Sequence, residues 1–338
     1  MKRVLLTGAF GAIGLHMFDH LLQNTDWELI LIDSFRHKGY YDRITNSCKD
    51  HPEYASRFST FHHDLVAPFT EREVEKLGKI DYIINLASLS DVQASIDNPV
   101  YIMRNNCELM FTMLELSRAL KPEVFLHFST DEVYGSTPKI GGGHKEWDKI
   151  KPSNPYAASK AAQEAFAISY WRSFGVPLII TNTMNNFGET QSPSKFPAMI
   201  QQKINADQVI DVHATVDGEI GTRYYLHSRN AADAVMFILK NVPPVAHQPG
   251  QDDEPVRLNI VGDKQVSNLE LVQIIGKLMG KEPRYELKYF HASNPGHDLH
   301  YGLNGEKLAA LGWKSPKSFE ESLANTIEWQ QTHPEWMK

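Results

Sequence analysis

Residues 4–14 of the chain read VLLTGAFGAIG, an apolar run that leads into a turn with glycines at positions 8, 11 and 14. Residues 2–6 have the apolar character of a short buried strand, and residues 15–22 show the apolar spacing of a helix. The glycines therefore fall between a strand and a helix. A strand–turn–helix start of this kind is typical of an α/β fold with a parallel sheet.

Further strands and helices alternate along the first half of the chain. Apolar runs predict strands at residues 28–32, 80–86, 124–129 and 178–183, and helices include residues 101–120 and 155–174. Because right-handed crossovers cover both faces of a parallel sheet, this alternation predicts an α/β fold with a doubly wound (Rossmann) sheet.

The pattern weakens after about residue 185, where short elements are separated by polar or Pro-rich loops such as residues 241–255. We therefore expect residues 1–184 to form a domain that holds a dinucleotide and the catalytic groups. Residues 185–338 are expected to form mainly a smaller α/β lobe for the substrate, with some chain returning to the first domain. Ligands of such sheets bind at the carboxyl ends of the strands.

The composition excludes several classes of function. Among 338 residues, 34 Lys and Arg stand against 41 Asp and Glu, and this net charge of -7 disfavours a general binder of nucleic acid or anionic membranes. No segment approaches the roughly 18–20 apolar residues that span a bilayer. Cys48 and Cys107 form no metal pattern, and His62-His63 lacks a third ligand at metal spacing. We expect a cytoplasmic protein without a metal.

The glycine turn predicts a dinucleotide site. Glycines there allow the backbone to approach a pyrophosphate, which then lies at a helix N-terminus. Asp33, about 20 residues further on, is placed to bind the adenosine ribose hydroxyls and favours NAD over NADP, because a carboxylate repels a 2′-phosphate. Asp64-Leu65 is placed to border the adenine, although Asp64 fits a turn or helix cap equally well.

A second pair of segments carries acid–base chemistry: Ser129-Thr130-Asp131-Glu132-Val133-Tyr134-Gly135 and Tyr156-Ala157-Ala158-Ser159-Lys160. A lysine four residues after a tyrosine shares its helix face and favours the phenolate, so Tyr156 is a candidate base. A redox base needs no neighbouring carboxylates, so Asp131 and Glu132 indicate an additional proton transfer. Alternatively, this acidic pair caps a helix or is merely solvated.

Six motifs, in order along nearly the whole chain, resemble the extended short-chain dehydrogenase/reductase family, and within it the nucleotide-sugar 4,6-dehydratases. They are TGAFGAIG (7–14), STDEVYG (129–135), NPYAASKAAQE (154–164), TNTMNNFG (181–188), RYYLHSRNAADAV (223–235) and NPGHDLHYGLNGEKLAALGW (294–313).

The resemblance implies a bound NAD and a set of residues around it. These are Gly8, Phe10, Gly11, Ile13, Gly14, Asp33, Ser34, Asp64, Leu65, Leu86, Ala87, Asn105, Ser129, Tyr156 and Lys160. It also implies the catalytic roles. Thr130 would hydrogen-bond the sugar 4-hydroxyl and Tyr156, paired with Lys160, would remove its proton. Glu132 would abstract the proton at C5, and Asp131 would protonate the departing C6 hydroxyl, giving a 4-keto-6-deoxy sugar.

On the substrate side, the resemblance implies contacts with a nucleoside-diphosphate hexose similar to dTDP-glucose. The residues are Ser88, Asn185, Lys195, Arg223, Asn259, His297 and Tyr301. The chain departs from the family at Leu89 and Asp91, where an acidic residue and a histidine are usual. It departs again at Ser194, where Glu is usual, and at Met184, where a small polar residue is usual. These departures lie around the sugar and the nucleotide.

The helices at residues 101–120 and 155–174 resemble the pair through which this family forms homodimers. Two other activities remain open. A UDP-glucuronate decarboxylase or a nucleotide-sugar 4-epimerase would share NAD and the Tyr156/Lys160 pair, but neither needs an acid for a C6 hydroxyl. A non-catalytic NAD-binding regulator could use the same fold.

Overall fold

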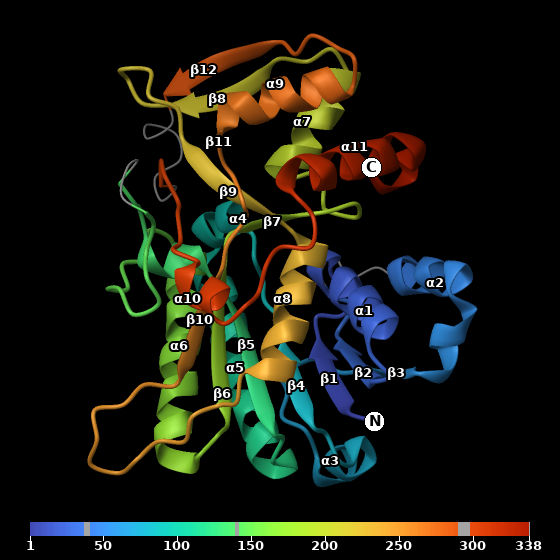
Figure 1. Cartoon of the computed structure of the whole chain (residues 1–338), viewed down its shortest axis with the longest axis vertical. Helices are drawn as coiled ribbons and strands as arrows, with labels where there is room; N and C mark the ends of the chain where they lie inside the picture. Colours follow the sequence, from blue (N-terminus) through green and yellow to red (C-terminus); the bar gives the residue numbers. More distant parts are fainter. Residues whose placement is uncertain (37–40, 139–141, 290–297, 338) are drawn as a thin grey trace.

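A seven-stranded parallel sheet forms the centre of the larger part of the molecule, with a smaller lobe above it (Figure 1). The computed structural model describes residues 1–36, 41–138, 142–289 and 298–337. The order of the sheet is β10-β6-β5-β4-β1-β2-β3. These strands are β1 (Arg3–Thr7), β2 (Glu28–Asp33), β3 (Phe58–His62), β4 (Tyr82–Asn85), β5 (Val124–Thr130), β6 (Leu178–Thr183) and β10 (Val256–Ile260).

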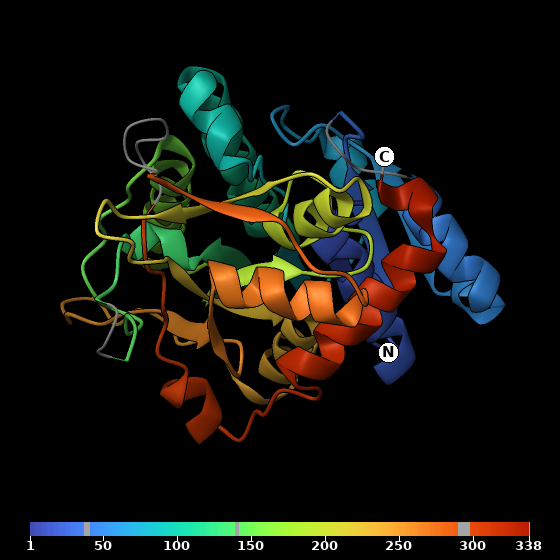
Figure 2. The ribbon, with the colours of Figure 1, turned by 90° about the horizontal axis from the view of Figure 1, so that it is seen from above.

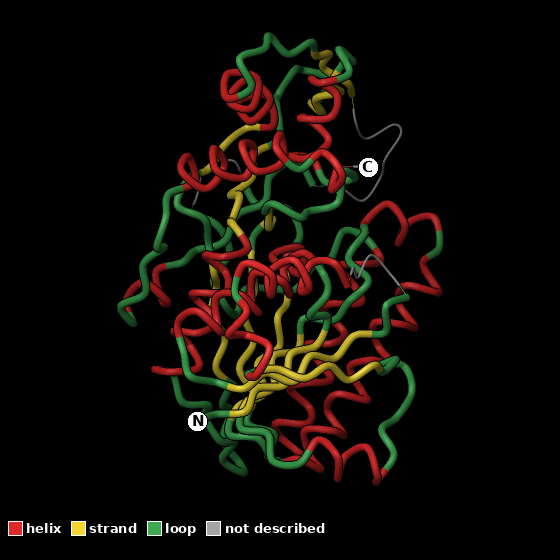
Figure 3. The backbone as a smooth tube through the Cα atoms, turned by 90° about the vertical axis from the view of Figure 1, so that its right-hand side faces the viewer, coloured by secondary structure: helices red, strands yellow, loops and turns green. Residues whose placement is uncertain are grey.

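Alternate side chains of each strand enter two separate cores, because successive residues of a strand face opposite sides of a sheet. Val4 and Leu6 pack with α1 (Ala12–Asn24) and α8 (Ser228–Asn241). Leu5, between them, packs on the other face with α5 (Pro99–Leu120) and α6 (Pro155–Phe174). The tube in Figure 3 shows helices on both sides of the sheet. The doubly wound α/β fold predicted from the sequence is confirmed.

The remaining elements of the large part are short. They are α2 (Tyr41–Asp50), η1 (Pro52–Ser56), α3 (Glu71–Leu77), α4 (Val92–Asp97), η2 (Asp131–Tyr134) and α10 (Glu306–Ala310). Strand β4 ends at Asn85, one residue before the predicted end. Leu86 and Ala87 leave the ladder, and both of their N–H groups donate to the Thr7 hydroxyl.

The smaller lobe has its own apolar core and two small sheets. One sheet has the order β11-β9-β7 and the other pairs β12 with β8. The elements are β7 (Asn185–Phe187), α7 (Phe196–Asn205), β8 (Ile210–Ala214), β9 (Thr222–His227), β11 (Gln265–Ser267), α9 (Asn268–Leu278), β12 (Tyr285–Tyr289), α11 (Phe319–Thr332) and η3 (Pro334–Met337). Phe187, Tyr225 and Phe319 lie in its core. Figure 2 shows α9 and α11 side by side.

Strand β10 joins the large sheet although it comes from the second half of the chain, between elements of the smaller lobe. It pairs with β6 in parallel, with Arg257 beside Ile180 and Asn259 beside Asn182. The carboxyl end of the sheet is therefore bordered by segments from both halves. Within the described ranges, no helix combines the length and apolar character needed to cross a membrane.

Candidate active site

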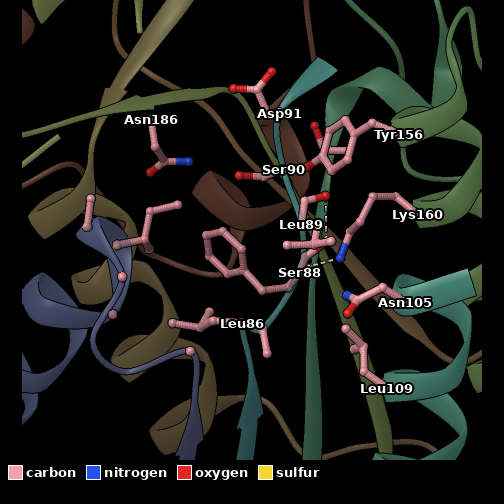
Figure 4. A pocket seen from close by; sticks show the side chains of 18 of the residues that line it. Leu86, Ser88, Leu89, Ser90, Asp91, Asn105, Leu109, Tyr156, Lys160 and Asn186 are labelled. Atoms are coloured by element: carbon pink, nitrogen blue, oxygen red, sulfur yellow. Dashed lines mark hydrogen bonds between the residues drawn. The ribbon is translucent and has the colours of Figure 1, made fainter. Parts of the chain in front are cut away.

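A cavity of about 830 Å³ opens at the carboxyl ends of the central strands. Its wall contains the glycine turn after β1, the end of β2, residues 86–88 after β4, and the ends of β5 and β6. Figure 4 shows Leu86 at the bottom of this cavity, Ser88 near its centre, and Tyr156 and Lys160 at its right. The two motifs that the sequence singled out therefore line one cavity.

The glycine turn is shaped by close backbone contacts. Gly8 has φ of +65°, which side chains other than glycine rarely adopt. A Cβ on Gly14 would lie 2.2 Å from the Gly8 carbonyl oxygen, so α1 can approach the turn only because this residue has no side chain. Phe10 lies in the same turn, but its ring is fully buried against Phe35 at 4.7 Å and does not line the cavity.

Asp33 ends β2 at the edge of the cavity. Its carboxylate accepts hydrogen bonds from the N–H groups of Phe10 (3.2 Å) and Phe35 (3.0 Å), which fix its orientation beside the turn. Further along the wall, Arg36 Nη2 lies 2.8 Å from Asp64 Oδ1 and donates to Asn105 Oδ1 at 3.0 Å. Arg36 thus joins two residues that the resemblance implied for cofactor binding.

Tyr156 and Lys160 project from the first turns of α6, whose N-cap Asn154 accepts the Ala157 N–H. The Lys160 ammonium donates to the Phe128 carbonyl (2.9 Å) and to Gln163 Oε1 (2.7 Å). Burial lowers the pKa of Lys160 to about 7. Burial also raises the pKa of the Tyr156 phenol, with the charges of Glu132 and Asp131 acting in the same direction.

The expected activation of Tyr156 by Lys160 stays a prediction. The ammonium is held by Phe128 and Gln163, and the charges felt by the phenol are those of the two carboxylates. A positive charge bound in the cavity would favour the phenolate.

The two adjacent carboxyl groups have different surroundings. Asp131 is buried and accepts the Thr130 hydroxyl at 3.0 Å, whereas Glu132 is half-buried and accepts the Asn154 amide at 3.0 Å. Burial, followed by the charge of Glu132, raises the pKa of Asp131 to about 7. Burial also raises the pKa of Glu132, while Asn154, Lys195 and Arg223 lower it. The pKa of both carboxyl groups is thus raised, and which of them donates a proton and which accepts one stays a prediction.

Several buried polar atoms in the wall have no hydrogen-bond partner among the described residues. They are Ser129 Oγ, Asp131 Oδ2, Asn185 Oδ1 and Asn186 Oδ1. Unpaired buried polar groups are costly, and native proteins rarely keep them. Together with the glycine cradle, this set fits a polar ligand, with the glycine turn and Asp33 facing a dinucleotide.

Most of the residues named from the sequence line this cavity. They are Gly8, Gly11, Ile13, Gly14, Asp33, Ser34, Asp64, Leu65, Leu86, Ala87, Ser88, Asn105, Ser129, Thr130, Asp131, Glu132, Tyr156, Lys160, Asn185 and Lys195. Phe10, Arg223, Asn259 and Tyr301 do not line it. His297 lies outside the described residues.

Arg223, Asn259 and Tyr301 make contacts within the protein, and their expected contacts with substrate stay a prediction. The Arg223 guanidinium donates to the carbonyls of Thr222, Asp298 and Leu299 at 2.6–2.8 Å. It also lies 4.3 Å above the Tyr301 ring. The buried Asn259 amide donates to the carbonyls of His144 (2.9 Å) and Asn304 (3.1 Å).

Further residues, which were not predicted from the sequence, form hydrogen bonds with the candidate catalytic residues. Gln163 contacts Lys160 and donates to the Asn106 carbonyl at 2.6 Å. Asn182 donates to the Thr130 carbonyl at 3.0 Å. The position of Gln163, three residues after Lys160 on the same helix, was the available signal for its contact. Asn182 lies on a neighbouring strand, which local sequence does not reveal.

His16, Glu189 and His227 form a cluster that resembles a metal site at first sight. Each histidine Nε2 lies 3.2 Å from Glu189 Oε2. However, His227 Nδ1 accepts the Arg229 N–H at 3.0 Å, so the neutral ring carries its proton on Nε2. A metal-bound histidine usually donates from its other nitrogen. The cluster is therefore a network of close polar contacts around a carboxylate, and the two histidines overcome burial to lower the pKa of Glu189 to about 2.

Known proteins resemble the chain over its whole length. A dTDP-glucose 4,6-dehydratase of Escherichia coli is 29% identical over 99% of the chain and 95% of the relative. The low-salt glycan biosynthesis protein Agl12 of Haloferax volcanii is 30% identical over 96% of the chain and 97% of the relative. Trifunctional dehydratase–epimerase–reductases of Arabidopsis thaliana also match, and the chain spans 48% of their length.

Solved structures and a family model agree with these relatives. A dTDP-glucose 4,6-dehydratase of Streptomyces venezuelae, crystallised with NAD, superposes with a TM-score of 0.85 at 26% identity and covers 100% of both chains. The family model described as GDP-mannose 4,6 dehydratase matches residues 5–326. Because that match includes the glycine turn, both catalytic segments and most of the smaller lobe, the chain belongs to this family of extended short-chain dehydrogenases/reductases.

Proposed function

We propose that the protein is an NAD-dependent nucleotide-sugar 4,6-dehydratase. It would convert a nucleoside-diphosphate hexose, such as dTDP-glucose, into the corresponding 4-keto-6-deoxyhexose. The observation that carries this proposal is the convergence of the Asp131–Glu132 pair and the Tyr156–Lys160 pair on one cavity. The curated relatives and the superposed structure include dTDP-glucose 4,6-dehydratases, which supports it.

The residues for a dinucleotide are present. The glycine turn would hold the pyrophosphate, Asp33 the adenosine ribose, and Asp64 with Leu65 the adenine. Bound NAD supplies a hydride acceptor and, later in the cycle, a hydride donor. The positive charge of its nicotinamide ring would favour the Tyr156 phenolate.

Oxidation at C4 of the sugar would use Thr130 and Tyr156. The Thr130 hydroxyl orients the 4-hydroxyl, and the Tyr156 oxygen accepts its proton as the C4 hydrogen leaves as hydride. Lys160, held by Phe128 and Gln163, keeps a buried positive charge or donor beside the ribose end of the cavity. The resulting ketone acidifies the proton at C5.

Elimination would use the two carboxyl groups. Glu132 accepts the C5 proton, and the electrons of that C–H bond form the C5–C6 double bond as the C6–O bond breaks. Asp131, which burial keeps protonated to about pH 7, donates its proton to the departing oxygen, so water is released. Glu132 then returns a proton to C5 when C6 is reduced.

The substrate end of the cavity includes Ser88, Asn185 and Lys195. A lysine suits a diphosphate, and Asn185 Oδ1 is buried without a partner among the described residues. We propose that residues 185–338 mainly serve this nucleotide-sugar site and residues 1–184 the cofactor. Leu89, Ser90 and Asp91 also line the wall, so the departures from the family pattern bear on substrate choice.

We further propose that the enzyme is a cytoplasmic homodimer. Helices α5 and α6 pack together and leave Met103, Phe111 and Phe174 exposed. Such a row of apolar side chains on adjacent helices suits burial against a second copy. Both cysteines, Cys48 and Cys107, are unpaired, which fits a reducing compartment.

Turnover in deuterated water tests the reaction. We expect a panel of nucleoside-diphosphate hexoses to include one that yields a 6-deoxy-4-keto product with deuterium at C5, detected by mass spectrometry and NMR. Tyr156→Phe, which keeps the ring but removes the proton acceptor, serves as the inactive control. An unlabelled 4-epimer would indicate an epimerase, carbon dioxide a decarboxylase, and no reduction of nicotinamide with any sugar a non-catalytic NAD-binding protein.

A further inference from the structure

Behind the catalytic turn lies a buried ion pair that the proposed reaction does not use. Arg257 on β10 is 1% exposed and Glu164 on α6 is 0% exposed, with Arg257 Nη2 2.9 Å from Glu164 Oε2. Desolvating two charges offsets most or all of their mutual attraction, and apolar residues of similar volume often stabilise a fold equally well. The retained pair therefore calls for a role other than stability.

Arg257 holds one end of the segment 130–134, which carries both catalytic carboxyls. Its Nη1 donates to the Tyr134 hydroxyl at 3.1 Å. That hydroxyl in turn donates to the Glu146 carbonyl at 2.7 Å. Tyr134 is the last residue of η2 and is 1% exposed, so its ring cannot shift without displacing the turn.

Glu164 holds the other end of the same segment through Asn182. The two hydrogens of the Asn182 amide go to Glu164 Oε1 (2.8 Å) and to the Thr130 carbonyl (3.0 Å). Thr130 is the last residue of β5 and the N-cap of η2. A single ion pair is thus connected to the first and to the last residue of the acid–base turn.

Glu164 also lies on the helix that carries the redox pair. Tyr156, Lys160 and Glu164 follow one another at intervals of four residues on α6 and share one side of it. Burial lowers the pKa of Lys160, and the charge of Glu164 opposes this effect, which places the two groups within electrostatic reach. The pair therefore links the helix of the redox residues to the turn of the acid–base residues.

We propose that the Arg257–Glu164 pair positions the turn 130–134 relative to α6, so that Asp131 and Glu132 face the same point of the cavity as Tyr156. Both are positioning residues, since neither lines the cavity. The kinetic test of this proposal rests on the proposed dehydratase function. Its structural test depends on the geometry of the protein alone.

The experiment removes both charges together. Breaking a buried pair by a single substitution leaves an uncompensated charge and can unfold the protein, whereas removing both partners often leaves the fold intact. In Glu164→Gln/Arg257→Met, the glutamine oxygen still accepts the Asn182 amide, while Tyr134 loses its donor. A control, His20→Gln/Asp233→Asn, removes a second pair of polar side chains. This pair is part-buried and joins α1 and α8 on the opposite face of the sheet.

Hydrogen exchange of the ligand-free protein is the first readout. The Glu132 N–H donates to the Thr130 hydroxyl and the Gly135 N–H to the Glu132 carbonyl. We expect both amides to exchange about tenfold faster in the double variant and unchanged in the control. Equal protection of these amides in a folded double variant would overturn the proposal, whatever reaction the enzyme catalyses.

Single-turnover kinetics are the second readout. A misplacement of about 1 Å can slow a chemical step by about 100-fold. We expect C4 oxidation within a few fold of wild type, elimination slowed at least about tenfold, and reduced nicotinamide accumulating. Arg257→Lys, which retains a charge and donors for Glu164 and Tyr134, should recover part of that rate. Unchanged elimination in the double variant would overturn the proposal. Absence of any reduction in the wild type would instead defeat the dehydratase function and leave the exchange result standing.

Discussion

The carboxyl groups of Asp131 and Glu132, which are neighbours in the chain, differ in their surroundings. The first is buried, whereas the second accepts a hydrogen bond from the Asn154 amide. Asp131 keeps its proton because its surroundings disfavour charge, and Glu132 is oriented by the Asn154 side chain. In the proposed reaction, this difference in environment would suit one residue to act as acid and the other as base. A sequence shows that both groups are available but not how their proton affinities separate.

Glu132→Gln should block elimination while leaving oxidation possible. The amide is nearly the same size and can still contact Asn154, but it cannot accept the C5 proton. We expect elimination to fall by about 10²- to 10⁴-fold, the usual contribution of a general base, with reduced nicotinamide accumulating. Stopped-flow absorbance measures both steps. Glu123→Gln, at an exposed position, is the control. Wild-type turnover in Glu132→Gln would remove this residue from the mechanism.

The rate of the elimination step should fall as the pH rises above about 7. Burial raises the pKa of Asp131 from its ordinary value to about 7, so the proton-donating form persists to about that pH and is lost above it. Because Glu132 is adjacent, the observed value belongs to the coupled pair. Single-turnover rates between pH 5.5 and 9, roughly the window around that value, should show the decline. In Asp131→Asn, the residual rate should no longer decline with pH. An identical decline in this variant would assign the proton to another group.

The Tyr156/Lys160 pair shows which properties the sequence alone does not predict. Helical spacing correctly places both side chains on one face of α6. It does not show that the ammonium donates to the Phe128 carbonyl and Gln163, so the inferred effect on the phenol stays a prediction. The direction of a pKa shift depends on burial and on distant charges, neither of which a four-residue spacing contains.

At the scale of elements, the sequence correctly predicted the strands, turns and helices that depend on residues close together in the chain. The strand β1, the glycine turn and α1 follow one another directly, and the sequence placed all three. The contacts of Arg223 and Asn259 depend on chain near residues 298–304, far along the sequence. Their internal roles could not be derived from the motifs in which they stand.

Gly14→Ala should damage the cofactor site and the packing of α1 together. The added Cβ would lie 2.2 Å from the Gly8 carbonyl oxygen and 2.6 Å from that of Ala9, and both obstacles are backbone. We expect a loss of stability of about 1–3 kcal/mol or more and weaker NAD binding. Thermal melting and calorimetric titration with NAD measure these effects. Gly302→Ala is the matched control, because the nearest atom to an added Cβ there would lie 3.5 Å away. Equal behaviour of the two variants would contradict this role for Gly14.

At the scale of the whole molecule, two parts predicted from the sequence share one cavity. Asn185 and Lys195 come from the second part and line the same wall as the glycine turn. The sequence indicated the change in pattern near residue 185, but it did not show that β10 completes the large sheet. Strand pairing between distant segments is set by the packing of the whole chain.

Phe111→Glu should dissociate the proposed homodimer. Phe111 is 42% exposed on α5, and its ring lies 4.5 Å from that of Phe166 on α6. A buried charge at a helix–helix interface is strongly unfavourable, so we expect a monomer in sedimentation analysis. Val216→Glu, at an exposed position of the smaller lobe, is the control. A wild-type protein that sediments as a monomer would contradict the homodimer.

The place of β10 in the large sheet has a consequence for biosynthesis. While the ribosome is still extending the chain, β6 has no neighbour on its outer edge, and its free N–H and C=O groups can attract other nascent strands. Arg257 reaches Tyr134 only when β10 arrives. A newly made chain would therefore complete the contacts of the turn 130–134 only after β10 is in place, and shielding of that open edge by a chaperone would matter most before then.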